Sequence, residues 1–244
     1  MTCVIFMSAE TSEMVAKEKD LVLPGQVVAK GLDFFPGTGC YRDNSEIRSK
    51  VVGLFRIKER FASVIPLSGV YLPKPDDGII AVVNDIQNTF WIFDINSPYD
   101  AILQLGEASE EYIENGADLR RYFDIGDIIY VKILNVATSK SVTLTMDDPR
   151  AKKLRGGRLI AITPSKVSRL IGKEGLMIEM VKQGTQCQIV AGQNGVVWIK
   201  GGNEELAVKT IKLIEESSHI SGLTERVAEM LKQNESNNPI QAEQ

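Results

Sequence analysis

The strongest constraint on the fold is a two-residue alternation of apolar and polar side chains, which recurs in short runs broken by Gly and Pro. It is present in LVLPGQVVAKG and again in SKVVGLFRIKERFASVIPL. Successive residues of a strand face opposite sides of a sheet, so runs of this kind indicate short antiparallel strands with one buried face. We therefore predict that residues 1–68 form a β-rich domain.

A second group of strands is predicted for residues 69–147. Two prolines, Pro73 and Pro75, and the turn sequence Asp76-Asp77-Gly78 mark its start. Its five apolar runs are GIIAVVNDI, NTFWIFDI, AILQL, DIIYVKILNV and SVTLTM. Five short strands in succession indicate a small Greek-key barrel of the OB type. The long polar segment between the third and fourth runs is interpreted as a partly helical insertion.

The pattern changes after Asp148-Pro149, where helices enter. The segment RAKKLRGG is interpreted as a basic linker. Beyond it RLIAIT indicates a strand, and SKVSRLI and LMIEMVKQ indicate two helices. CQIVAGQ and GVVWIKG then indicate a hairpin that turns at Asn194-Gly195. NEELAVKTIKLIEESS indicates a last helix, capped by Asn203. Residues 148–218 thus predict a β-α-α-β-β-α domain, and residues 219–244 a short amphipathic helix with a disordered tail. The predicted fold class is multidomain and mainly β, with an α+β part.

Composition argues against membrane and metal-dependent functions. No apolar run approaches the roughly 18 residues of a membrane span, and the first residues lack the basic region of a secretory signal. We expect a cytoplasmic protein with no membrane partner. The three cysteines, Cys3, Cys40 and Cys187, lie far apart, and His219 is the single histidine. No metal site, no cofactor and no Ser/His or Cys/His catalytic centre is therefore expected. Carboxylates beside Gly turns are interpreted as turn residues; these are Asp76, Asp77, Asp124 and Asp127.

Charge is distributed unevenly along the chain. The net charge is -4, from 28 basic and 32 acidic residues. Residues 69–147 hold 5 basic and 13 acidic residues, whereas residues 148–218 hold 12 and 7. The excess of basic residues is concentrated in residues 148–175, which hold 8 basic and 2 acidic residues. A local anion-binding site is therefore expected within an acidic protein.

Gly172-Lys173-Glu174-Gly175 lies between the two predicted helices of the β-α-α-β-β-α segment, and this spacing is typical of a KH domain. Two glycines allow the backbone to turn sharply and approach a sugar-phosphate chain. The N–H groups of the following helix and the Lys173 ammonium can then meet the phosphates. Glu174 opposes phosphate binding unless it points to solvent. A GxxG sequence alone is a weak signal, and the element order and the nearby cations strengthen it.

The residues expected to contact RNA are the members of this loop and the basic side chains near it or in the barrel insertion. They are Gly172, Lys173, Gly175, Arg169, Lys152, Lys153, Arg155, Arg158, Arg120 and Arg121. The alternative for the basic run at residues 150–158 is a solvated linker. The alternative for Arg120 and Arg121 is a surface salt bridge with nearby carboxylates.

Aromatic side chains are the remaining candidates for RNA contact. Phe90, Trp91 and Phe93 lie on an alternating strand, so either Trp91 or the phenylalanines are expected to face outward. Such a ring could stack on a base, and core packing is the alternative. Trp198 is interpreted as a core residue.

Several phrases in chain order carry a resemblance to a known family. They are LPG and GTGCYR, IPLSGVYLPKPDD, FDINSPYDA, LRGGRLIAITPSKVSRLIGKEG and GQNGVVWIKG. Over residues 15–233 the chain resembles the RNA-exosome cap subunit of the KH-bearing type in its archaeal form. The resemblance implies an N-terminal domain anchored on a ring of RNase-PH-like subunits, an S-one-type barrel beside the central pore and a KH domain outside it. It also implies single-stranded RNA as ligand, three cap subunits on a six-membered ring, and a phosphorolytic site in other chains, so that this chain catalyses nothing.

The barrel departs from many S-one-type domains, because it lacks their histidine and much of their basic and aromatic surface. We therefore expect it to guide RNA at few points, such as Arg120 and Arg121, with the KH region supplying more of the affinity. One rival interpretation is a free-standing S-one/KH transcription or translation factor. Another is a polynucleotide phosphorylase, which usually places KH before the barrel and needs an RNase-PH-like domain for which this chain has no room.

Overall fold

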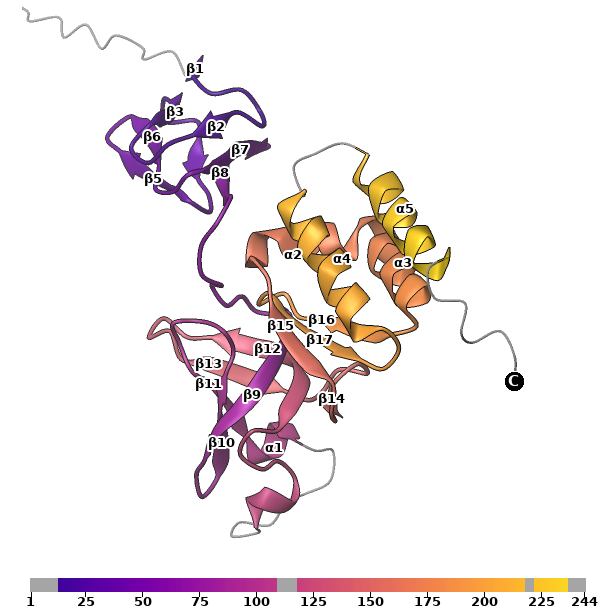
Figure 1. Ribbon diagram of the computed structural model, residues 1–244. Coiled ribbons are helices and arrows are strands. Elements are labelled where there is room, and N and C mark those ends of the chain that lie inside the picture. Colours follow the sequence, from indigo (N-terminus) through magenta and orange to yellow (C-terminus); the bar gives the residue numbers. More distant parts are fainter. Residues whose placement is uncertain (1–12, 109–117, 218–221, 237–244) are drawn as a thin grey trace, which may run out of the picture. The chain divides into compact units, whose positions relative to one another are not determined.

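The computed structural model describes residues 13–108, 118–217 and 222–236 (Figure 1). The chain divides into two compact units, Met1–Gly69 and Val70–Gln244, which are described separately. Cys3, His219 and the polar tail after residue 236 lie outside the described residues, so what was expected of them stays a prediction.

The first unit consists of short strands in two sheets, as the alternation predicts. One sheet has the order β1-β3-β6-β5 and the other the order β2-β7-β8-β4. Neighbouring strands are antiparallel, except that β4 and β8 are parallel. The strands are β1 (Glu13–Met14), β2 (Leu21–Val22), β3 (Val27–Lys30), β4 (Phe35–Pro36), β5 (Cys40–Asp43), β6 (Glu46–Ser49), β7 (Gly53–Lys58) and β8 (Phe61–Pro66).

Both sheets contribute to one core in this unit. Ile47 of the first sheet and Phe55 and Val64 of the second are fully buried in a common cluster. The register between β7 and β8 sets Phe55 opposite Val64 and Leu54 opposite Ile65. Because successive residues face opposite sides, burial of the first pair leaves Leu54 and Ile65 exposed on the outer face.

The second unit begins with the five-stranded OB-type barrel that the sequence predicts. Its strands follow the order β13-β11-β10-β9-β12, and pairing of β12 with β13 closes the barrel. β11 pairs with β13 in parallel, and all other pairings between the described barrel strands are antiparallel. The elements are β9 (Gly78–Ile86), β10 (Phe90–Asp94), β11 (Ala101–Gln104), α1 (Leu105–Ala108), the 3-10 turn η1 (Leu119–Arg121), β12 (Ile128–Val136) and β13 (Val142–Thr145).

The aromatic residues of β10 lie differently from the expectation. Trp91 and Phe93 are both fully buried, so the prediction that either the tryptophan or the phenylalanines face outward is wrong. Residues two apart on a strand share a face, and both rings pack against Phe123, at centroid distances of 5.4 and 6.5 Å. The indole N–H of Trp91 also donates to the Phe123 carbonyl at 3.1 Å. Phe90 points the other way and is half-buried.

The segment interpreted as a basic linker contains a strand of the barrel sheet, which corrects that expectation. β14 (Lys152–Leu154) pairs antiparallel with the first half of β12, with Leu154 opposite Ile128. Leu154 is buried in a cluster with Ile80, Tyr130 and Trp198. A three-residue strand with one buried side chain shows too little alternation to be recognised in the sequence.

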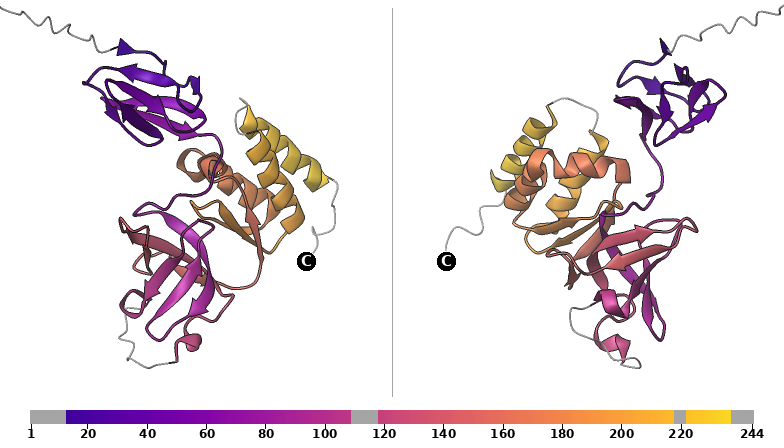
Figure 2. Two further views of the ribbon diagram at one scale, coloured as in Figure 1. Left: turned by 90° about the vertical axis from the view of Figure 1, so that its left-hand side faces the viewer. Right: turned by 180° about the vertical axis from the view of Figure 1, so that it is seen from behind.

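The remaining elements follow the predicted β-α-α-β-β-α order. They are β15 (Arg158–Ala161), the turn η2 (Pro164–Lys166), α2 (Val167–Ile171), the turn η3 (Lys173–Gly175), α3 (Leu176–Thr185), β16 (Gln188–Ala191), β17 (Val196–Lys200), α4 (Glu204–Glu216) and α5 (Leu223–Ser236). The three strands form an antiparallel sheet in the order β15-β17-β16. The helices cover one face of it (Figure 2). Asn203 caps α4 through its side chain, as predicted.

The other face of this sheet packs against the barrel. Trp198 lies in the cluster formed with Ile80 and Tyr130, and its indole N–H donates to the Gly156 carbonyl at 2.7 Å. The predicted hairpin turn supplies Asn194, which is fully buried. Its side-chain amide donates to the carbonyls of Ile80 and Ile95 at 2.7 and 2.9 Å. Asn194 thereby links the KH sheet to the barrel backbone in β9 and directly after β10.

Candidate nucleic-acid interface

The GxxG loop has a backbone that requires its glycines. α2 ends at Gly172, which has φ 75° and ψ −178°. A Cβ at this position would lie 2.6 Å from the Cβ of Met177, which is buried in the KH core. Gly175 has φ 81°, in the left-handed region that glycine adopts without strain. The chain can therefore turn sharply between α2 and α3, with no side chain at either glycine of the loop.

One basic residue precedes this turn and another lies within it. Arg169 in α2 and Lys173 in η3 are exposed, and neither forms an ion pair with any residue that the structure describes. Glu174 is also exposed and has φ 55°. Leu176, at the first position of α3, is an exposed apolar side chain next to the loop. The positive end of the α3 dipole lies at the same place.

A second group of cations surrounds the connection from β14 to β15. Arg155 and Arg158 flank two glycines with positive φ, and a Cβ at Gly157 would collide with the Ile199 carbonyl. The ammonium of Lys200 donates to the Arg155 carbonyl at 2.8 Å, so Lys200 joins this group. Within the described ranges, none of these three cations is paired with a carboxylate. Lys200 was missed in the sequence because it lies 42 residues beyond Arg158, on a strand that returns beside β15.

Other basic residues of the same segment are already paired. Lys153 forms an ion pair with Asp127 of the barrel, and Arg150 pairs with Asp148 at 3.2 Å. Hydrogen bonds from Arg150 hold the pKa of the Asp148 carboxyl below its usual range. The Arg150 guanidinium also lies over the ring of Tyr130, 5.8 Å from its centroid. These two cations help to fix β14 on the barrel, whereas Lys152 is exposed.

The GxxG group and the Arg155 group lie at opposite ends of α3. The helix starts directly after Gly175. At its other end the Thr185 carbonyl accepts a hydrogen bond from the Asn203 N–H, three residues after Lys200. A ten-residue helix is about 15 Å long, so roughly that distance separates the start of α3 from Thr185 at its end.

The third cationic group is on the barrel, at η1. Arg120 and Arg121 are exposed, and Arg121 has Asp118 as a distant ion-pair partner at 3.8 Å. Tyr122, the next residue, is also exposed. Charge alone singles out the two arginines in the sequence and not this tyrosine, although the run RRYF places it beside them.

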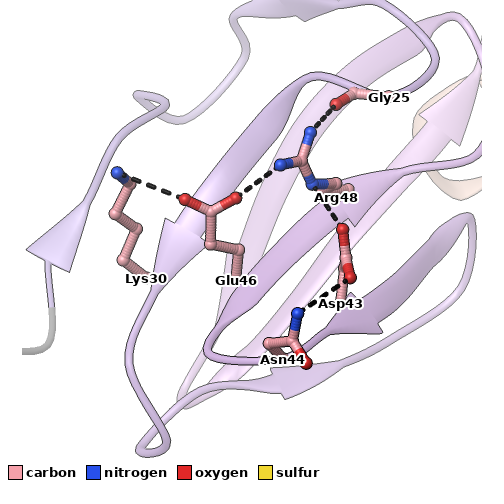
Figure 3. Close-up of polar contacts among 6 residues, drawn as sticks. All are labelled: Gly25, Lys30, Asp43, Asn44, Glu46 and Arg48. Carbon is pink, nitrogen blue, oxygen red and sulfur yellow. Dashed lines mark hydrogen bonds and ion pairs between the residues drawn. The ribbon is translucent and has the colours of Figure 1, made fainter.

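The two sheets of the first unit have outer faces of different character. On the sheet β1-β3-β6-β5, Lys30 pairs with Glu46 at 3.2 Å, and Arg48 bridges Glu46 and Asp43 (Figure 3). On the other sheet five outward residues are apolar and exposed: Leu21, Phe35, Leu54, Phe61 and Ile65. Arg56 and Lys58 of β7 and Ser63 of β8 share this outer face.

These apolar residues form two groups across the strands, with Arg56 and Ser63 paired between them. Leu21 lies opposite Leu54, and Leu54 opposite Ile65. Phe35 lies opposite Phe61, with ring centroids 5.6 Å apart. Several adjacent exposed apolar side chains of this kind are typical of a surface that binds another protein.

The described residues contain no group of three or more His, Cys, Asp or Glu side chains placed to hold a metal ion. Among the same residues, none of the helices is long and apolar enough to cross a membrane. The four aspartates beside Gly turns each have a protein partner. Asp76 pairs with Lys132 at 2.8 Å, and Asp77 accepts from the Tyr71 hydroxyl at 2.5 Å. Asp124 accepts from the Ile125 N–H at 2.8 Å, and Asp127 from the Asp124 N–H at 2.7 Å.

Comparison with known proteins gives matches over both units. A family model described as the exosome RNA binding protein RRP4 N-terminal domain matches residues 19–68, and a KH domain model matches residues 157–205. A crystal structure described as that of a candidate exosome complex RNA-binding protein is 28% identical, with a TM-score of 0.63, and covers 69% of this chain and 99% of its own.

Curated relatives extend this similarity to most of the chain. The exosome complex component Rrp4 of Methanothermobacter thermautotrophicus is 44% identical over 89% of this chain and 70% of its own length. The Rrp4 of Methanothermus fervidus is 43% identical over 89% of this chain and 97% of its own length. The Rrp4 of Thermococcus kodakarensis is 43% identical over 90% of this chain and 87% of its own length. With the β-rich unit, the OB-type barrel and the KH fold in the same order, the chain belongs to the archaeal Rrp4 family of exosome complex components.

Proposed function

We propose that this chain is a non-catalytic, cytoplasmic cap subunit of an archaeal exosome. It captures the 3′ ends of single-stranded RNA and guides them into a phosphorolytic ring of RNase-PH-like subunits for 3′-to-5′ degradation and processing. The observation that carries this proposal is the set of exposed cations around the GxxG loop, the Arg155 loop and η1, in a chain whose relatives are named exosome components.

RNA binding is proposed to start at the KH part. Gly172 and Gly175 leave the loop backbone open, and Lys173 and Arg169 supply positive charge beside it. Single-stranded RNA is the form whose bases and phosphates can both reach such a loop. A strand that also meets Arg155, Arg158 and Lys200 would follow α3 for about its whole length.

The proposed contacts are individually weak, and their number supplies the affinity. Each cation that neutralises a phosphate of a single strand contributes about 0.7 to the slope of log affinity against log salt. Three copies of the chain on one ring would present three such sets to one RNA. Binding of one strand at two sets raises the overall affinity through effective concentration, without any new contact.

The first unit is proposed to dock on the ring. The outer face of the sheet β2-β7-β8-β4 carries five exposed apolar side chains beside Arg56 and Lys58, whereas the other sheet satisfies its charges internally through Lys30, Glu46 and Arg48. Covering apolar side chains with a partner stabilises the complex by about 25 cal/mol per Å² of apolar surface buried. The ring subunits are the partner that the exosome assignment of the relatives suggests.

The test is size-exclusion chromatography with light scattering on a mixture of this chain and the two RNase-PH-like subunits of its organism. Co-elution at three copies per hexameric ring is expected. Failure to co-elute, with RNA binding retained by the chain alone, would contradict the cap assignment and favour a free-standing S-one/KH factor. Phosphate-dependent RNA decay by the chain alone would contradict its non-catalytic role.

A further inference from the structure

The barrel strands that OB folds usually use for nucleic acids carry no cations in this chain, and Lys140, in the loop after β12, is the one basic residue of the two loops that OB folds use with them. OB folds bind oligonucleotides with their second and third strands and with the loops after the first and fourth strands. Here the second and third strands are β10 and β11, and the sequence contains no Lys or Arg from residue 75 to residue 119. The outward residues Asp94 and Gln104 offer a phosphate no positive charge.

The segment after β11 offers a different binding surface, which is anchored to the core at two points. Leu119 and Phe123 are buried, and the indole N–H of Trp91 donates to the Phe123 carbonyl at 3.1 Å. The Asp118 carboxylate accepts from the Arg120 N–H at 3.3 Å and so caps η1. The short turn between these anchors therefore has a defined backbone.

Three consecutive exposed side chains stand between the two anchors: Arg120, Arg121 and Tyr122. The side chain of Arg121 is 83% exposed, and Tyr122 is 42% exposed. Arg120 has no carboxylate partner among the residues for which the structure gives positions. We call these three residues the η1 platform.

We propose that the η1 platform binds single-stranded RNA by stacking one base on the Tyr122 ring while Arg120 and Arg121 contact the neighbouring phosphates. This inference rests on the proposed RNA-binding function and shifts the barrel's RNA contact away from the usual OB face. Proteins that bind single strands combine cations with exposed aromatic rings, because every base has a π-face.

Charge favours RNA over a protein partner at this position. The barrel segment carries a net charge of -8 in residues 69–147, so a polyanion is repelled from most of its surface. The two adjacent arginines are the local exception. An exposed ring beside two guanidiniums matches the repeat of base and phosphate along one strand, whereas an acidic protein surface would need only the cations.

The test measures binding of the full chain to a single-stranded RNA and to an abasic strand of the same length, by fluorescence anisotropy over a salt series. Tyr122→Ala should weaken binding of the base-bearing RNA by at least about fivefold and leave the abasic strand unaffected. Tyr122→Phe keeps the ring and should bind like the wild type. Arg120→Gln with Arg121→Gln should weaken both strands and lower the salt slope by about 0.7 per lost contact.

Leu134→Ala is the matched control, because it removes an exposed apolar side chain of the barrel outside the η1 platform and should leave RNA affinity unchanged. Equal loss on both strands with Tyr122→Ala, or no loss, would overturn the stacking role. If Arg155→Gln with Arg158→Gln still lowers affinity in that case, the proposed RNA-binding function stands without the η1 platform. If the wild-type chain binds neither strand, both proposals fail. Loss of ring co-elution with unchanged RNA affinity would assign the platform to protein docking.

Discussion

Replacing Asn194 by alanine should loosen the junction between the barrel and the KH sheet. The Asn194 side chain is fully buried, and its amide donates to the carbonyls of Ile80 and Ile95 at 2.7 and 2.9 Å. Its Oδ1 accepts from the Ile80 N–H at 3.4 Å, a longer and weaker contact. Alanine at position 194 provides neither donor, so both buried carbonyls lose a partner.

The two short hydrogen bonds determine how much unfolding free energy the substitution should cost. A buried polar group left without its partner costs about 1 to 3 kcal/mol. The strand neighbours of Ile80 can compensate in part, so we take the lower half of the range and expect a loss of about 2 to 4 kcal/mol for the pair. Alanine also leaves unfilled volume where the amide stood, which acts in the same direction.

Tryptophan fluorescence during urea unfolding measures this loss selectively. The chain has two tryptophans, Trp91 and Trp198, and both are buried in the second unit. The unfolding midpoint of Asn194→Ala should fall by about 1 M urea or more at an unchanged slope. Asn88→Ala, at an exposed loop position, is the matched control and should change the free energy of unfolding by less than about 0.5 kcal/mol. Equal midpoints for the two variants would refute the role assigned to Asn194.

Three further predictions concern the GxxG loop, the apolar side chains of the β2-β7-β8-β4 sheet and the half-buried carboxyl of Asp77. Gly175→Asp should weaken RNA binding in a filter assay, because open space beside Gly175 admits the new carboxylate at the proposed phosphate site. Gly175→Asn, which tolerates a positive φ and adds no charge, should bind more tightly than Gly175→Asp; equal losses would point to backbone strain. Leu54→Asp should abolish co-elution with the ring, whereas Lys30→Asp on the polar sheet should retain it; loss with both variants would contradict docking through these apolar side chains. Burial raises the pKa of Asp77, although a hydrogen bond from Tyr71 opposes this shift. A carboxyl with a raised folded-state pKa loses its stabilising contribution as pH rises through that pKa, so the stability of Asp77→Asn relative to wild type should increase from acid to neutral pH. A pH-independent difference in urea titrations would show that Asp77 is not perturbed.

The extent to which the sequence predicts this fold depends on the length of each pattern. The five barrel strands and the KH elements repeat their alternation or helical period over enough residues to be recognised, and the structure confirms them. β14 is three residues long and carries one buried side chain, Leu154, so the local sequence resembles a linker. For Trp91 and Phe93 the spacing of two already implies a shared face, although it does not decide whether that face is buried.

Contacts across long sequence separations could not be predicted in the same way. The turn at Asn194 is recognisable, but its partners Ile80 and Ile95 lie 114 and 99 positions away. The density of cations near residue 150 is equally visible, yet the pairing of Lys153 with Asp127 depends on how β14 lies against β12. Lys200 joins Arg155 only because β17 returns beside β15. Charge counts locate a basic segment, and the sheet register decides which of its cations remain free.

Phosphorolysis of a single-stranded RNA by the RNase-PH-like ring, with and without this chain, tests directly whether the chain captures and guides RNA. The assay supplies inorganic phosphate and follows the length of the RNA products over time, with the chain at three copies per ring. We expect the chain to speed decay or make it more processive, high salt to remove this gain, and the chain alone to degrade nothing. Identical decay with and without the chain, under conditions where it co-elutes with the ring, would contradict a role in capturing and guiding RNA.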